Sequence, residues 1–157
     1  MAHYQVIIER LQQLKREIPV IVGNEMVNFA IDNIHAEGFE GDKWDPRKPG
    51  APRNNGRGLL KDTGDGERSI RVSREDESEV HVTANDYMEA HNTGATIRGN
   101  FSVREHTRKR RGRSMTVKAH SRNVNTTLPT RTFLAPSKTL NTRIATAIVK
   151  RFRILIS

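Results

Sequence analysis

The sequence predicts an α+β domain in which an antiparallel β-sheet of two hairpins is flanked by an N-terminal and a C-terminal helix, with long protruding loops. Two observations lead to this prediction. Apolar residues recur every three or four positions near both ends of the chain, which is typical of amphipathic helices. Between these ends, short segments alternate polar and apolar residues and are rich in β-branched types, which is typical of half-buried strands. The chain has 157 residues, so we expect one domain spanning 1–157.

The N-terminal helical segment, residues 1–35, carries two stretches with helical periodicity. In the first stretch, four apolar residues share one helical face: Ile7, Leu11, Leu14 and Ile18. Pro19 removes an amide donor and clashes with the preceding turn, so we expect the helix to kink or restart there. A second stretch runs from about residue 20 to residue 34, although Gly23 weakens its pattern.

Residues 36–58 are expected to form a long, irregular loop, because they contain five glycines and three prolines and show no periodicity. The only tryptophan of the chain, Trp44, lies inside this loop. We expect its indole to lie on the domain and anchor the loop, since large aromatic side chains in loops mostly bury area. A binding role is the alternative interpretation, and Trp44 is therefore also a candidate for a subunit interface.

The β-sheet is expected within residues 59–135, and its first hairpin begins after a turn-like segment. Residues 69–73 and 79–83 alternate polar and apolar side chains and are joined by the acidic residues 74–78. Such a pair of segments around a polar turn predicts a β-hairpin. A short polar helix or turn, residues 87–94, then follows.

The second predicted hairpin carries a basic arm, residues 104–122. Its outgoing strand is expected over residues 95–98 and 101–103, and its return strand over residues 115–119. The tip between them packs many like charges and has no core to bury, so we expect it to protrude and to be mobile without a partner.

The C-terminal helix is expected over residues 137–156, where apolar residues again follow helical spacing. Ser137 suits the N-cap position, and Pro136 lies just outside it. We expect this helix to pack across the sheet.

The net charge of +9 is unevenly distributed along the chain. Residues 104–122 hold eight Lys and Arg against one Glu, whereas residues 62–79 hold seven Asp and Glu against three Arg. A basic patch of this kind attracts phosphates or an acidic protein surface. We expect the arm to dock on an acidic neighbouring subunit, with nucleic-acid contact and a solvated loop as alternatives.

The composition disfavours several classes of protein. The absence of cysteine excludes disulfides and thiolate metal sites, and no two of the six histidines have the spacing of a metal-binding pair. The first residues lack a signal-peptide pattern, and no apolar stretch approaches the roughly 20 residues that span a bilayer. We therefore expect a soluble, unexported chain without membrane contact, metal or cofactor.

Enzymatic function is also disfavoured by the motifs. The sequence has neither a phosphate-binding loop of the Gly-x-x-x-x-Gly-Lys type nor a Gly-x-Ser-x-Gly elbow. The acidic residues Glu75, Asp76, Glu77 and Glu79 are compatible with a two-metal nuclease. A solvated hairpin turn is the preferred interpretation, because catalytic carboxylates usually come from several elements inside a cleft.

Four landmarks follow one another along the chain: Trp44-Asp45-Pro46, Leu59 to Gly64 with the following Arg68-Ser69-Ile70, Tyr87 to Gly94, and Leu128-Pro129-Thr130-Arg131-Thr132-Phe133-Leu134. In their order and spacing they resemble the virion morphogenesis (tail completion) family of tailed phages and Mu-like prophages. The resemblance covers roughly residues 4–156. It implies a small protein of the tail-terminator and neck type that forms an oligomeric ring at the head–tail junction.

The resemblance also implies partners, a location and residue roles. The expected partners are further copies of the chain and the tail-tube and head-connector proteins, with non-specific DNA contact as a further option. The expected location is the virion neck, and the host cytoplasm during assembly. The fold landmarks are Leu60, Gly64, Tyr87, His91, Gly94, Pro129, Phe133 and Leu134. The candidates for subunit contacts are Trp44, Arg131, Arg108, Lys109, Arg110, Arg111 and Arg113.

Local geometry suggests what the landmark residues do. Tyr87 and His91 are four residues apart and share one face of a helical turn, from which His91 is able to hydrogen-bond to a loop. Gly94 is expected to end that turn in a left-handed conformation. Pro129 is expected to keep its segment extended, and Phe133 and Leu134 are expected to plug the sheet. An exposed guanidinium at Arg131 is expected to meet a carboxylate of an adjacent subunit.

Overall fold

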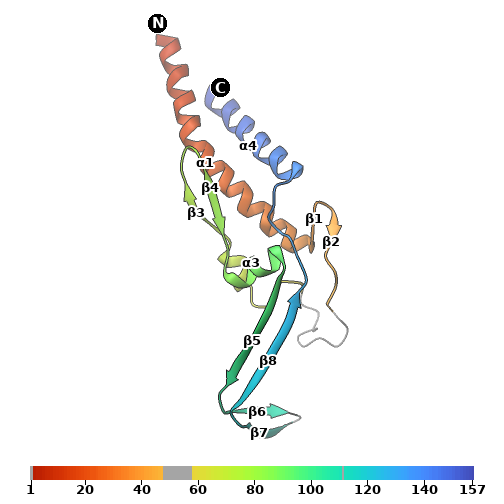
Figure 1. The fold of residues 1–157 in the computed structure, drawn as a ribbon. Helices are drawn as coiled ribbons and strands as arrows, with labels where there is room; N and C mark the ends of the chain where they lie inside the picture. The colour runs from red at the N-terminus through yellow and green to blue at the C-terminus, as the bar shows by residue number, and fades with distance from the viewer. Residues whose placement is uncertain (1, 48–57, 111) are drawn as a thin grey trace.

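The computed structural model describes residues 2–47, 58–110 and 112–157. The fold is mixed α+β, with helices at both ends of the chain and antiparallel strands between them, as predicted (Figure 1). The elements in order are α1 (Ala2–Ala36), β1 (Gly38–Phe39), β2 (Asp42–Lys43), α2 (Asp65–Ser69), β3 (Arg71–Glu75), β4 (Val80–Thr83), α3 (Asp86–Thr93), β5 (Ala95–Val103), β6 (His106–Arg110), β7 (Arg113–Val117), β8 (His120–Leu128) and α4 (Lys138–Ile156). In the described residues the strands form four two-stranded antiparallel sheets.

Helix α1 is continuous from Ala2 to Ala36, so the break expected at Pro19 is wrong. Proline costs a helix one backbone hydrogen bond and a steric clash. Here Pro19 and Leu14 are both buried, and α1 packs against α4 and against the β3–β4 hairpin. Tertiary packing on both sides of the proline therefore holds the helix together.

Helix α4 begins at the predicted cap, where the Ser137 hydroxyl accepts a hydrogen bond from the Leu140 amide at 2.9 Å. It runs antiparallel to α1 rather than across a sheet, and this corrects the expected packing (Figure 1). The Arg151 guanidinium donates to both carboxylate oxygens of Glu17, at 2.6 and 2.8 Å. Arg143 bridges Glu25 at 3.2 Å and Asp32 at 2.7 Å. The two helices thus pack against each other and are linked by the salt bridges of Arg143 and Arg151.

The core lies where the C-terminal half of α1 meets α3 and the loop segments. Its buried apolar side chains are Ala30, Ile34, Leu60, Ile70, Met88 and Phe133, with Trp44 and Leu134 packed against them. The β3–β4 hairpin, which was predicted, packs on α1 beside Gly23. Gly23 therefore marks a close approach between helix and strand, since a Cβ there would lie 2.7 Å from Val72 Cγ2.

Two segments differ from the sequence prediction near this core. The expected irregular loop 36–58 contains a tight hairpin, β1–β2, and its residues 48–57 lie outside the described residues. Ser69 belongs to the short helix α2 and not to the first strand, which begins at Arg71. The turn-like glycines around Asp65 gave no periodic signal for so short a helix.

A long two-stranded arm extends away from this body (Figure 1). Strand β5 pairs with β8 over nine residue pairs, from Ala95–Leu128 to Val103–His120. The expected return strand over residues 115–119 is wrong, because Arg113–Val117 is β7 and pairs with β6 at the end of the arm. The basic tip is therefore a second two-stranded β-ribbon, which was not predicted from the sequence.

Candidate assembly interface

The landmarks of the sequence meet at one joint between α3 and the segment that leads from β8 to α4. The Asn92 side chain makes three hydrogen bonds to this segment: it accepts from the Phe133 amide at 2.8 Å and the Leu134 amide at 3.0 Å, and it donates to the Leu134 carbonyl at 2.9 Å. The Arg131 amide donates to the His91 carbonyl at 2.7 Å. The root of the arm is thereby attached to the helix that precedes it.

Trp44 joins the β1–β2 hairpin to the same joint. Its indole Nε1 donates to the Thr132 carbonyl at 3.0 Å, and its ring packs against the core. Leu60 is buried in that core with a left-handed φ of 61°. The anchoring contact expected for Trp44 is therefore present, and the aromatic side chain connects two loops that are far apart in the sequence.

Two glycine landmarks occupy positions that favour glycine. Gly64 caps α2 with a φ of 77°. Gly94 ends α3 with a φ of 78°, but its ψ of 140° places it outside the left-handed helical region, so the left-handed conformation expected for it is wrong. A Cβ at Gly94 would overlap Thr130 Oγ1, so the chain passes from α3 into β5 directly beside the Pro129–Thr130 segment.

Tyr87 and His91 share one face of α3, as expected. Their rings meet edge to face with centroids 4.6 Å apart, and His91 is buried while Tyr87 is exposed. Burial, followed by the charge of Arg131, lowers the pKa of His91 below its ordinary value, and a hydrogen bond to the Pro129 carbonyl acts in the opposite direction. His91 is thus a buried side chain that packs helix α3 against the segment leading to α4.

Arg131 is buried, which corrects the expectation of an exposed guanidinium. Only 8% of its surface is exposed, and its Nε has no hydrogen-bond partner among the described residues. Burial lowers the pKa of its guanidinium, while Tyr87 acts in the opposite direction. A side chain in this position has little surface to offer to another subunit.

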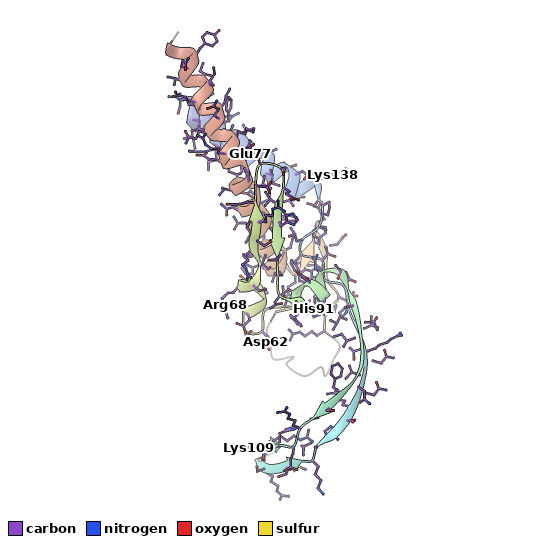
Figure 2. The ribbon with its side chains drawn as sticks, turned by 60° about the vertical axis from the view of Figure 1, so that its left-hand side comes forward. Asp62, Arg68, Glu77, His91, Lys109 and Lys138 are labelled. Atoms are coloured by element: carbon purple, nitrogen blue, oxygen red, sulfur yellow. The ribbon has the colours of Figure 1, made fainter. Side chains whose placement is uncertain are left out.

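The basic tip is an exposed cationic surface at the end of the arm. Arg108, Lys109 and Arg113 are exposed on β6 and β7 and form no ion pair there. Lys109 lies at the far end of the arm, away from the body (Figure 2). For Arg110 only the strand position is described, and Arg111 lies outside the described residues.

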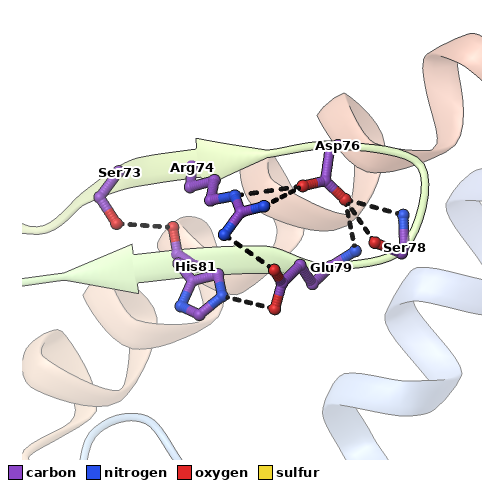
Figure 3. Close-up of polar contacts among 6 residues, drawn as sticks. All are labelled: Ser73, Arg74, Asp76, Ser78, Glu79 and His81. Atoms are coloured by element: carbon purple, nitrogen blue, oxygen red, sulfur yellow. Dashed lines mark hydrogen bonds and ion pairs between the residues drawn. The ribbon is translucent and has the colours of Figure 1, made fainter.

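The acidic turn between β3 and β4 is held by its own hydrogen bonds (Figure 3). The Asp76 carboxylate accepts from the Ser78 amide at 2.9 Å, the Ser78 hydroxyl at 2.7 Å and the Glu79 amide at 3.0 Å. These bonds, with the charge of Arg74, lower the pKa of Asp76. Arg74 also pairs with Glu79 at 2.9 Å. The turn is therefore a structured surface loop in which the Asp76 and Glu79 carboxylates are paired within the hairpin itself.

Over residues 2–47, 58–110 and 112–157, no helix has the length and apolar character that crossing a membrane requires. The same residues contain no group of three or more His, Cys, Asp or Glu side chains placed to hold a metal ion. Comparisons with models of protein families, with curated proteins and with solved structures gave no match.

Sequence reasoning missed two features of this surface. Asn92, the residue that ties α3 to Phe133 and Leu134, carries no signal in a single sequence beyond its place in a landmark. The second feature is the unbroken strand β5, whose residues 95–103 have Ala, Ile, Gly, Phe and Val at the odd positions. The prediction interrupted that strand at Gly99-Asn100, two residue types that are common in turns.

Proposed function

We propose that this chain is a structural subunit of a tailed-phage virion that forms an oligomeric ring at the neck, where it completes or terminates the tail and joins it to the head. The observation that carries the proposal is the meeting of all four landmarks around one joint, through Trp44, Leu60, Asn92 and Phe133. Residues that lie far apart in the sequence thus act together to hold the arm on the body.

The shape of the chain supports an assembly role. The body has a small buried core, whereas the arm and the N-terminal end of α1 extend from it in opposite directions (Figure 1). Large apolar side chains remain exposed on both extensions, including Tyr4, Ile8 and Phe101. Contiguous exposed apolar surface on a small protein is typical of interaction sites. In a ring, such extensions are ordered between neighbouring subunits, and no catalytic chemistry is required.

Electron microscopy of the chain with its partners tests this proposal. The chain is coexpressed with the tail-tube and head-connector proteins encoded by the same phage genome, and the particles are imaged. We expect closed rings that cap tubes or join them to connectors, whereas the tail-tube protein of an unrelated phage serves as the control and should recruit none. The absence of rings in every combination would contradict the proposal.

A second function is favoured by one observation, the unpaired cations of the basic tip. A two-stranded ribbon fits the major groove of duplex DNA, and Arg108 and Lys109 are free to neutralise phosphates. In that case, affinity for a random duplex falls steeply with salt and is lost when Arg108, Lys109, Arg110 and Arg111 are all changed to Ala. Fluorescence anisotropy at several salt concentrations measures this, and binding that is absent or insensitive to salt would reject it.

A further inference from the structure

The arm has one polar face and one largely apolar face. Directly opposed residues of an antiparallel pair project to the same side. One side carries the pairs Thr96–Thr127, Arg98–Asn125, Asn100–Asn123 and Ser102–Ser121, all of them polar. The other side carries Ala95–Leu128, Ile97–Thr126, Gly99–Val124, Phe101–Arg122 and Val103–His120. We call this second side the apolar arm face.

Nothing in the described chain covers the apolar arm face. Phe101 lies over Gly99, with a ring atom 3.2 Å from the position of a Cβ there, yet half of its surface is exposed, and so is 40% of Ile97. None of the residues described between Ala95 and Leu128 is buried. An isolated two-stranded ribbon is marginally stable in water, so this face needs a second surface against which to pack.

A matching surface lies at the opposite end of the molecule. The first turns of α1 extend beyond the end of α4 (Figure 1), and they expose Tyr4, Ile7, Ile8 and Leu11. Tyr4, Ile7 and Leu11 are spaced by three and four residues and therefore share one stripe of the helix. We call this stripe, with Ile8 beside it, the free α1 end.

Each of the two apolar surfaces adjoins charge of opposite sign. The acidic β3–β4 turn lies next to the free α1 end, because Glu77 pairs with Lys15, one helical turn after Leu11, at 2.7 Å. Glu75 in the same turn is exposed and has no ion-pair partner among the described residues. The arm that carries the apolar arm face, in turn, ends in the basic tip with Arg108 and Lys109. Each surface thus combines an apolar part with a charged part, and the two charged parts have opposite signs.

These charges cannot meet within one chain. Figure 2 shows Glu77 beside the long helices and Lys109 at the far end of the arm, with the body between them. The contact that satisfies both surfaces is therefore one between two copies. It joins different surfaces of the two partners, and such head-to-tail contacts close into a ring when the rotation between copies allows it.

We propose that the arm of one copy docks on the body of the next, with the apolar arm face on the free α1 end and the basic tip beside the acidic β3–β4 turn. This proposal rests on the assembly role proposed above and names the surface and the occupant. Phe101 and Leu11 bury apolar area, while Arg108 and Lys109 meet Glu75 and Glu77. The charged part steers the approach of the two copies and is screened by salt.

Zero-length carbodiimide cross-linking of the full chain tests the contact directly. Copies with light and heavy nitrogen are mixed before cross-linking, so that mass spectrometry separates links between copies from links within one. We expect Lys109 to link to Glu75 or Glu77 in mixed light and heavy pairs. Links of Lys109 to other carboxylates, or the absence of mixed pairs, would overturn the proposal.

Substitutions then test both parts of the contact by sedimentation. Phe101→Ser is expected to weaken self-association roughly tenfold or more, since it removes one large buried side chain. Asn100→Ser on the polar face of the same strand is the matched control and should leave self-association unchanged. An equal effect of the two variants, or no effect of Phe101→Ser, would overturn the proposal, and thermal unfolding of both verifies that the body remains folded.

Charge reversal tests the charged part of the contact independently. Arg108→Glu with Lys109→Glu is expected to weaken association by roughly a hundredfold, and Glu75→Lys with Glu77→Lys to restore it to within about tenfold of the original. Failure of the second pair to restore association would overturn the proposed pairing. So would a basic tip that binds duplex DNA and yields no link between copies. Mixed cross-links in an open chain without rings would instead retain this contact and contradict the ring.

Discussion

Asn92 and Leu134 hydrogen-bond to each other in both directions: Asn92 Nδ2 donates to the Leu134 carbonyl at 2.9 Å, and the Leu134 amide donates to Asn92 Oδ1 at 3.0 Å. The same Oδ1 also accepts from the Phe133 amide. One side chain at the end of α3 therefore satisfies backbone groups that no helix or strand of the described chain pairs. This segment carries Phe133 into the core, so its geometry determines both the packing of the body and the direction of the arm.

Replacing Asn92 with Ala should reduce the free energy of unfolding by roughly 2 to 4 kcal/mol, because three backbone groups in a partly buried segment lose their partner. Urea denaturation followed by circular dichroism measures the change. Asn92→Asp keeps the acceptor and loses the donor, and it should fall between Ala and the original residue. Asn28→Ala, at an exposed position of α1, is the control and should change stability little. A similar loss in both alanine variants would contradict the role of Asn92.

Local patterns were sufficient to predict the elements whose signal lies within one segment. The amphipathic ends gave α1 and α4, the alternation around residues 74–78 gave the β3–β4 hairpin, and Ser137 gave the start of α4. These features depend on neighbours three or four residues away, or on one short turn. A single sequence contains that information.

The errors arose where distant packing decides the outcome. Pro19 is a helix breaker by local rules, yet α1 passes through it because α4 packs alongside. Gly23 weakens a helix by local rules, yet it is the point where β3 approaches α1. Arg131 was expected to expose its guanidinium from an extended segment, yet it is buried in the fold.

The salt bridge between Glu17 and Arg151 predicts a loss of stability in acid. The two hydrogen bonds from Arg151, then that from Gln13, lower the pKa of Glu17 from its ordinary 4.5 to about 2. A carboxylate with a lowered native pKa stabilises the fold fully above its unfolded pKa, and this contribution is lost as the pH falls from 4.5 through 2. The difference in unfolding free energy between the original chain and Glu17→Gln should therefore shrink across that range.

Urea titrations at several pH values measure this difference. Glu9→Gln, at an exposed position of the same helix, is the control and should show no such convergence. A gap between Glu17→Gln and the original chain that stays constant from pH 7 to pH 2 would show that the salt bridge does not contribute through its charge.

Arg131 lies in a landmark, yet we expect the fold to tolerate its replacement by an uncharged residue. Its guanidinium is desolvated, and its Nε has no partner among the described residues, so burial of the charge opposes folding. Arg131→Met keeps the apolar stem and removes the charge, and it should leave stability unchanged or raise it by about 1 kcal/mol. Self-association should also be unchanged, because the side chain is buried. Loss of the oligomer with the fold intact would instead return Arg131 to the subunit interface.

The contact between Gly23 and Val72 predicts a change of sign in a double-mutant cycle. Alanine in place of glycine in a helix interior gains about 1 kcal/mol. At Gly23, however, the new Cβ would lie 2.7 Å from Val72 Cγ2, and the β-branched valine has few other rotamers to adopt. Gly23→Ala should therefore reduce the free energy of unfolding by roughly 1 to 2 kcal/mol.

In a Val72→Ala background the obstructing methyl groups are gone, so the same Gly23→Ala change should become stabilising by about 1 kcal/mol, the full difference in helix propensity. Chemical denaturation of the four proteins of the cycle gives the coupling between the two positions. Asn24→Ala, one residue along the exposed side of α1, reports the effect of propensity alone. If Gly23→Ala changes the free energy of unfolding in the same direction with valine and with alanine at position 72, then contact with Val72 does not explain the glycine at position 23.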